Sequence, residues 1–206
     1  MKRRLPLIFV AVFTVIGLVG ATIAGVAASA GSFSPVAYRV NDTKVSQATV
    51  DHDLKALADS DTAAKVEKVF GQAPTTTEGS VSSSFVAVWL DLQIRNELLR
   101  QGAERAEVDV TDRDREAQRA VVDQLLASNN ISFQLADLPA PLERALLDNY
   151  AYPVALGLDT QEKVSAFFTA AVRKADIAID PRYGFWNPRQ GVCPPTGCAS
   201  TPAAGG

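Results

Sequence analysis

Helical periodicity dominates this sequence between residues 46 and 174. Apolar residues recur there at the three- and four-residue spacing that buries one face of a helix, and capping residues, glycines and prolines separate the stretches. The stretches predict helices that begin near Ser46, Asp61, Ser84, Thr111, Pro139 or Pro141, and Thr160. Outside them, Ala37–Val40 and Ile177–Asp180 show the two-residue alternation that predicts strands.

The two predicted strands lie at opposite ends of the helical region, so their pairing would clasp the domain shut. The expected fold is therefore mainly α: a multi-helix domain closed by a small two-stranded pairing of its N- and C-terminal segments. Apolar residues make up 47% of the chain, which is enough for a hydrophobic core and argues against wholesale disorder.

The longest predicted helix, from about Ser84 to Ala103, carries two adjacent apolar faces. One face holds Phe85, Val88, Trp89, Leu92 and Leu99, and the other holds Val86, Leu90, Ile94 and Leu98. Two such faces indicate contact with several elements or with a bound ligand. For Trp89, a core position is the more common role on a central helix. Phe167 and Phe168 likewise fit either of two roles, a position in the core or a position in a peptide-binding groove.

The first 30 residues predict a targeting segment. A basic cluster at residues 2–4 precedes an uncharged stretch at 5–30, which ends in the small-x-small pattern Ala28-Ser29-Ala30. The stretch exceeds the usual apolar region of a signal peptide, roughly 7–15 residues, and it reaches the length of a transmembrane helix. A cleaved signal peptide and an N-terminal membrane anchor both stay open. Either one places the remaining chain outside the cytoplasm, because the basic flank stays inside.

The charge balance of the chain disfavours nucleic acid as a partner. The whole chain carries −3, and without the three basic residues at positions 2–4 it carries −6. A mildly acidic domain without a Lys/Arg cluster repels the phosphate backbone. No nucleic-acid partner is expected.

The only two cysteines, Cys193 and Cys198, lie in a short stretch rich in proline and glycine. In an oxidising compartment they are expected to form a local disulfide. A structural zinc site would need further ligands, and the chain has a single histidine, His52. No metal and no cofactor are therefore expected. The composition of residues 189–206 predicts a disordered tail.

Catalytic patterns are weak in this sequence. His52 lies between two carboxylates but off the apolar stripe of its helix, which places it on a solvated face. No nucleophile-elbow sequence is present. The acidic run at residues 109–116 lacks the central glycine of a calcium loop. No enzymatic activity is predicted.

Three motifs, taken in order, resemble the SurA N-terminal domain family. They are Val40–Ser46, where a strand leads into a serine-capped helix, Glu107–Asp112 before the fourth helix, and Ile179–Trp186 at the closing strand. Asp42 stands where the family usually has glycine. The resemblance covers most of residues 36–188 and implies a SurA-N-like helical domain, related to the peptide-binding part of trigger factor.

The resemblance implies ATP-independent, chaperone-type binding of unfolded or partly folded exported proteins. The candidate peptide-binding residues are Phe85, Trp89, Leu92, Phe167 and Phe168. Longer relatives often carry a parvulin-type prolyl isomerase module, for which this chain has neither the length nor the paired histidines. Two alternatives remain: an envelope protein with one dedicated partner, and a prolyl isomerase of a different type.

Overall fold

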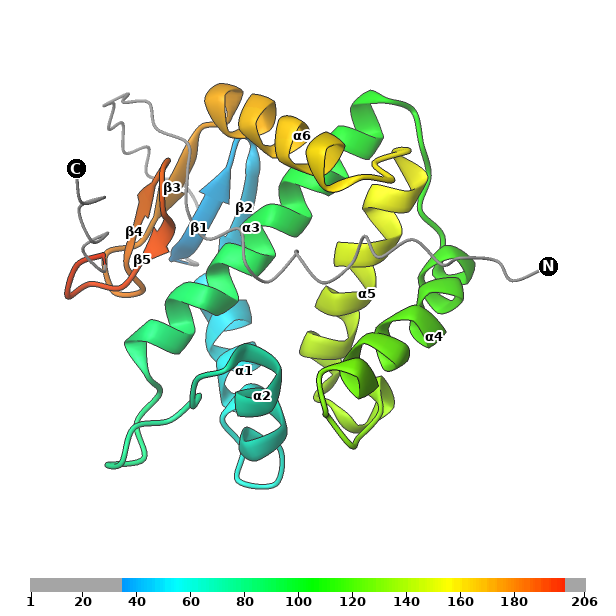
Figure 1. Ribbon diagram of the computed structural model, residues 1–206. Helices are drawn as coiled ribbons and strands as arrows, with labels where there is room; N and C mark the ends of the chain where they lie inside the picture. The colour runs from blue at the N-terminus through cyan, green and yellow to red at the C-terminus, as the bar shows by residue number, and fades with distance from the viewer. Residues whose placement is uncertain (1–34, 199–206) are drawn as a thin grey trace, which may run out of the picture.

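The computed structural model describes residues 35–198, and helices make up most of this part (Figure 1). In chain order the elements are β1 (Val36–Val40), β2 (Thr43–Ser46), α1 (Gln47–Leu57), α2 (Ala63–Phe70), α3 (Ser83–Arg105), α4 (Asp112–Ser128), the 3-10 helix η1 (Leu135–Asp137), α5 (Ala140–Ala155), α6 (Gln161–Lys174), β3 (Ile177–Ile179), β4 (Phe185–Asn187) and β5 (Gly191–Cys193). The prediction of a mainly-α fold is confirmed.

Helix α3 is the central element of the domain. It packs against α5 and α6 and contacts strands β1 and β5 (Figure 1). Both of its predicted apolar faces are used inside the protein: Phe85, Trp89, Leu90, Ile94 and Leu99 are fully buried. The excess apolar surface of α3 therefore serves contact with several elements of the same chain.

Three predicted helix starts are confirmed by their capping bonds. The side chains of Ser46, Thr111 and Thr160 each accept a hydrogen bond from the backbone N–H three residues further on. Such bonds satisfy donors that the first helical turn leaves free. The start of α2 differs, because its N-cap is Thr62 rather than Asp61, and the Thr62 side chain makes no capping bond.

The predicted clasp between the ends of the domain is also confirmed. Strands β1 and β3 pair antiparallel, with Tyr38 opposite Ile179 and Val40 opposite Ile177. Strand β2 was not predicted; it pairs with the other edge of β1 and gives the order β2-β1-β3. The turn is only two residues long, and Asn41 enters it with a φ of 55°. Asparagine tolerates this left-handed conformation, which suits a tight hairpin.

The prediction of disorder after residue 188 is wrong for residues 191–193. Strand β5 pairs with β4 and packs on α3, and only 9% of Val192 and 2% of Cys193 is exposed. The predicted disulfide joins Cys193 to Cys198, with Cα atoms 4.8 Å apart. The segment is ordered because Val192 joins the core and the disulfide closes the chain behind it. The proline and glycine content did not indicate that Val192 joins the core.

The predicted targeting segment at residues 1–30 lies outside the described residues, as do residues 199–206. Across residues 35–198, none of the helices combines the length and the hydropathy that a bilayer-crossing segment needs.

Candidate functional site

Helix α6 is the only α-helix within residues 35–198 that has no buried residue. Its predicted apolar stripe consists of Val164, Phe167, Phe168, Ala171 and Val172, and all five side chains are half-buried. We call these five residues the α6 face. Helix α6 lies across α3 at the top of the molecule, in orange (Figure 1). An amphipathic helix normally buries this stripe, so the α6 face is incompletely covered apolar surface.

Phe167 is seated directly on the backbone of α3. A Cβ atom placed on Gly102 would lie 2.6 Å from the Phe167 ring and 3.6 Å from Leu156. Only glycine at this position lets the ring approach so closely. The rings of Phe167 and Phe168 meet edge to face, with centroids 5.5 Å apart, an arrangement that aromatic pairs favour.

Arg95 places a positive charge next to Phe168. The guanidinium of Arg95 lies 5.4 Å from the centroid of the Phe168 ring, which is within cation–π range. Nε of Arg95 is also 2.6 Å from a carboxylate oxygen of Asp91. The other oxygen of Asp91 accepts the backbone N–H of Val192 at 3.4 Å. Arg95 and Asp91 therefore link the α6 face to the C-terminal hairpin.

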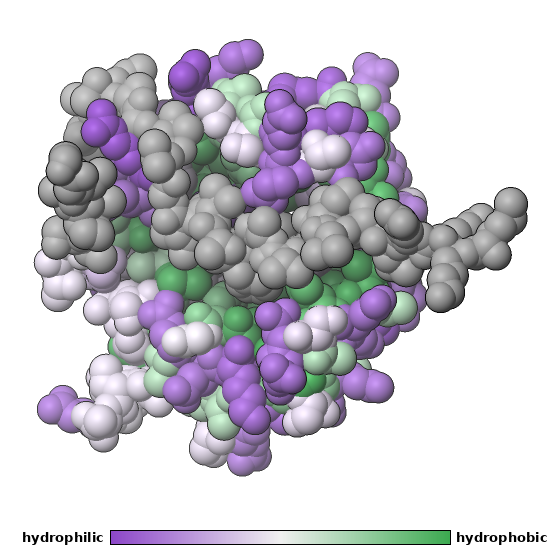
Figure 2. Space-filling model, viewed as in Figure 1, coloured by the Kyte–Doolittle hydropathy of each residue, from purple (hydrophilic) through white to green (hydrophobic). Residues whose placement is uncertain are grey.

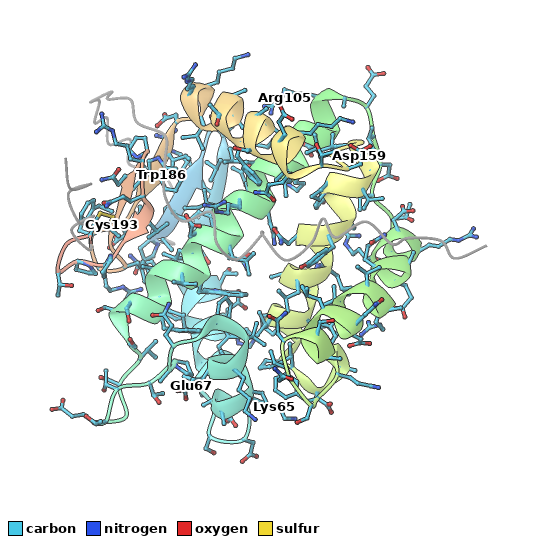
Figure 3. The ribbon with its side chains drawn as sticks, viewed as in Figure 1. Lys65, Glu67, Arg105, Asp159, Trp186 and Cys193 are labelled. Carbon is cyan, nitrogen blue, oxygen red and sulfur yellow. A yellow bond between two sulfur atoms is a disulfide. The ribbon has the colours of Figure 1, made fainter. Side chains whose placement is uncertain are left out.

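A second hydrophobic cluster lies beneath α6, separate from the main core. Its buried members are Leu99, Ala103, Val110, Ala151 and Tyr152, which we call the satellite cluster. Phe167 and Phe168 pack against it while remaining partly exposed. Figure 3 labels Asp159, just before α6, and Arg105, at the end of α3, at the same edge of the molecule. The satellite cluster is thus covered in part by α6, a helix whose own apolar side chains are only half-buried.

Two of the five predicted peptide-binding residues cannot contribute to an open surface. Phe85 and Trp89 are 0% exposed, and Phe85 packs edge to face on Phe70 of α2 with centroids 5.4 Å apart. They are core residues because α2 and the other elements around α3 cover that part of the helix. Leu92, Phe167 and Phe168 are half-buried, and Leu92 lies one turn before Arg95 on α3.

The view in Figure 2 shows hydrophobic surface between the polar side chains near α6 and the polar surface of the helices below it.

Gly102 and the satellite cluster were missed as candidate site residues. The available signal was a glycine inside a strongly helical stretch, which often marks a close packing contact. Periodicity could not show what that contact was.

The first motif of the SurA resemblance has a structural role. Asn41 donates from Nδ2 to Oε1 of Gln101 at 2.6 Å, and its Oδ1 accepts the backbone N–H of Asp176 at 2.9 Å. The backbone N–H of Asn41 also donates to the carbonyl of Asp176 at 2.7 Å. Asn41 therefore ties the β1–β2 turn to α3 and to the end of α6.

A half-buried carboxylate, that of Glu97, supports this turn. Burial by itself would raise the pKa of the Glu97 carboxyl, but hydrogen bonds from Arg100, Thr43 and Gln101 outweigh it and hold the pKa below its usual range. Glu97 is thus ionised in the folded protein and accepts Nε2 of Gln101 at 2.7 Å. Its role here is to hold α3 against the turn.

The third motif also closes the fold. The hydroxyl of Tyr183 donates to Asp51 at 2.7 Å, and the guanidinium of Arg182 lies 4.5 Å from the Tyr183 ring centroid. Arg182 also pairs with Asp51 at 3.1 Å. Figure 3 shows Trp186 and Cys193 on the same side of the molecule, where the C-terminal hairpin packs. These contacts attach the closing segment to α1.

The remaining motif, Glu107–Asp112, leads into α4 through a reciprocal capping box between Thr111 and Asp114. His52 is exposed on α1, as predicted. Among residues 35–198 no three His, Cys, Asp or Glu side chains gather in a way that could hold a metal ion.

No protein-family model, curated protein or solved structure matches the chain. The SurA-type resemblance therefore stays a prediction that rests on its three motifs.

Proposed function

We propose that this protein binds non-native polypeptides outside the cytoplasm, without ATP, in the manner of a SurA-N-like chaperone domain. The observation that carries the proposal is the α6 face: five apolar side chains on one helix, none of them buried. A contiguous, incompletely covered apolar surface is a feature of protein interaction sites. The resemblance of three motifs to the SurA N-terminal domain family points the same way.

The energetics fit a reversible holding function. Covering on the order of 200 Å² of apolar surface would give roughly 5 kcal/mol. The loss of translational and rotational freedom on binding offsets much of that gain. Contacts of this kind are weak and tolerate many client sequences, and release needs no energy input.

Charge supports the same class of partner. Residues 35–198 contain all 23 acidic residues of the chain, and 17 of its 20 basic residues, so their net charge is −6. A net charge well away from zero keeps a protein with exposed apolar surface soluble. It also disfavours nucleic acid as a ligand.

A single dedicated envelope partner is the second candidate. The burial of Phe85 and Trp89 favours it, because the accessible aromatic side chains among the five predicted residues are then only Phe167 and Phe168. A few central aromatic residues often supply most of the binding energy in a one-to-one interface. The two candidates differ in how many unrelated clients the surface accepts.

The test is suppression of aggregation of several unrelated, chemically denatured clients by the full chain without ATP. We expect suppression, and we expect Phe168→Ser and Val172→Ser to change its strength, because both substitutions alter the α6 face. Val81→Ser is the matched control, because Val81 is a 38% exposed valine far along the chain from α6. Circular dichroism confirms that each variant folds.

Wild-type protein that suppresses aggregation of none of the clients would contradict the proposal. Suppression that is equal in the wild type, Phe168→Ser and Val172→Ser would remove the α6 face from it. Tight binding to one client and none to the others would favour the dedicated partner. A prolyl-isomerisation assay on the same samples tests the enzymatic alternative.

A further inference from the structure

We infer that α6 is a displaceable cover, and that the client occupies the surface beneath it in the place of α6. That surface consists of the satellite cluster, the backbone at Gly102 and the part of the main core on which Phe168, Ala171 and Val172 pack. The inference rests on the proposed function and specifies the client segment: an amphipathic helix whose apolar residues follow the spacing of the α6 face.

The first observation is the shallow seating of α6. Every residue of the helix is at least partly exposed, whereas Leu99 beneath it is 0% exposed and Ala151 is 1% exposed. Helices with few buried apolar contacts open at a lower free-energy cost than core helices. Displacing α6 therefore exposes the apolar surface around Leu99 and Ala151, while α6 itself gives up no fully buried residue.

The second observation is that the two ends of α6 are attached unequally. At its C-terminal end, Asp176 exchanges hydrogen bonds with Asn41 and pairs with Arg39 at 2.8 Å. These contacts join α6 to the sheet across more than 130 positions of the sequence.

At the N-terminal end the polar contacts are local. Lys163 pairs with Asp159 at 2.7 Å and donates to the carbonyl of Gly157 at 3.3 Å, six positions away. Gly157 has a φ of 66°, and no atom lies within 4 Å of the position of an added Cβ. This loop can change direction without breaking a distant hydrogen bond. The helix would therefore pivot about its fixed C-terminal end.

The third observation is the fit between the cover and its seat. Phe167 occupies the space that a side chain at residue 102 would fill, and small residues such as Ala103 and Ala151 lie around it. The seat therefore accepts an aromatic ring projecting from a helix. Another segment with apolar residues at the i, i+3, i+4, i+7 and i+8 positions can present the same shape.

Competition between cover and client sets the affinity. When α6 is seated, only the small open fraction of the protein can bind, and the apparent Kd rises in inverse proportion to that fraction. The covered state also hides the satellite cluster from other copies of the protein. Weak, reversible holding follows from this arrangement without any nucleotide.

The experiment uses a fluorescent peptide with the sequence of residues 159–175 and the full chain. We expect fluorescence anisotropy to show binding of this peptide, and we expect a Phe167→Ala peptide to bind about tenfold more weakly. The peptide should also compete with a denatured client. Hydrogen exchange of the free protein should be faster in residues 161–174 than in α3 and α5.

Gly102→Ala is the decisive protein variant, because its methyl group occupies the seat of Phe167. We expect α6 to exchange about tenfold faster in this variant while the peptide binds about tenfold more weakly. General unfolding would accelerate exchange in α3 and α5 as well, and the thermal transition detects it. Gly79→Ala is the control for an added methyl group far from α6: its φ of 81° costs some backbone strain, but no atom lies within 4 Å of its added Cβ.

Each outcome bears on one of the two proposals. If clients are held but the α6 peptide neither binds nor competes, the displaceable cover is wrong and the proposed function stands. If the peptide binds but no client is held, the proposed function is wrong while the seat stands. Equal protection of α6, α3 and α5 against exchange would also overturn the cover.

Discussion

Two asparagines with the same backbone conformation have different roles. Asn41 and Asn130 both adopt left-handed φ values, of 55° and 60°. Asn41 is half-buried and uses both side-chain polar atoms, on Gln101 and Asp176. Asn130 is exposed after the end of α4. The sequence marks both as turn residues, but only the fold shows which one joins three elements.

Asn41→Gly keeps a residue that tolerates positive φ and removes only the side-chain hydrogen bonds. We expect it to lower the free energy of unfolding by about 1–3 kcal/mol, because the backbone N–H of Asp176 and Oε1 of Gln101 lose their partners. Asn130→Gly should change it by less than about 0.5 kcal/mol. Urea denaturation of both variants measures the difference. Equal effects would show that the side chain of Asn41 adds no stability.

At the scale of elements, the C-terminal hairpin shows how a poor sequence signal can hide a strand. Strands β4 and β5 are three residues each, too short for alternation to identify. Gly184, just before β4, has a φ of 134° and lies against the carbonyl of Cys193. The hairpin forms because this glycine permits close contact with β5 and because Asp91 accepts the N–H of Val192.

Gly184→Ala should destabilise the protein by more than about 2 kcal/mol. The added Cβ would overlap the carbonyl oxygen of Cys193, and alanine disfavours this φ. Gly79→Ala separates the backbone strain from the steric overlap. Gly79 has a φ of 81°, but no neighbour lies within 4 Å of an added Cβ. It should cost only about 1 kcal/mol. Thermal or urea denaturation gives both values, and similar losses would mean that the contact with β5 is unimportant.

Helix α6 shows the limit of periodicity at the same scale. Its stripe was predicted correctly from Val164, Phe167, Phe168 and the following residues, and the cap at Thr160 is confirmed. Periodicity gives the face that a helix turns toward its neighbours but not how deeply that face is buried. The depth depends on Gly102 and the satellite cluster, which come from other helices.

For the whole molecule, the four tyrosines make stability sensitive to high pH. Burial raises the pKa of Tyr150 to about 12, and burial together with the hydrogen bond to Asp51 raises the pKa of Tyr183 to about 12. Burial also raises the pKa of Tyr38 and of Tyr152. In the unfolded chain these hydroxyls ionise near the ordinary value of 10. Between about pH 10 and 12 the folded protein therefore holds protons that the unfolded chain has lost.

This difference in bound protons predicts that the free energy of unfolding falls as pH rises from about 10 to about 12. The stabilisation is fully present below the unfolded pKa of 10. Urea midpoints measured across this range test the slope, and absorbance at 295 nm follows the phenolates directly. Tyr183→Phe should flatten the slope. Folded protein whose tyrosines all ionise near pH 10 would contradict the prediction.

The sequence by itself determined the helices, most of their caps and the pairing of Ala37–Val40 with Ile177–Asp180. Those features depend on local spacing and on side chains that bond their own backbone nearby, so they can be read without a fold. Only the tertiary structure decided that Phe85 and Trp89 are core, that Val192 and Cys193 belong to a strand, and that α6 lies half-covered on Gly102. Burial depth is a property of what other segments bring to a surface, and residues far apart in the chain carry no local record of it.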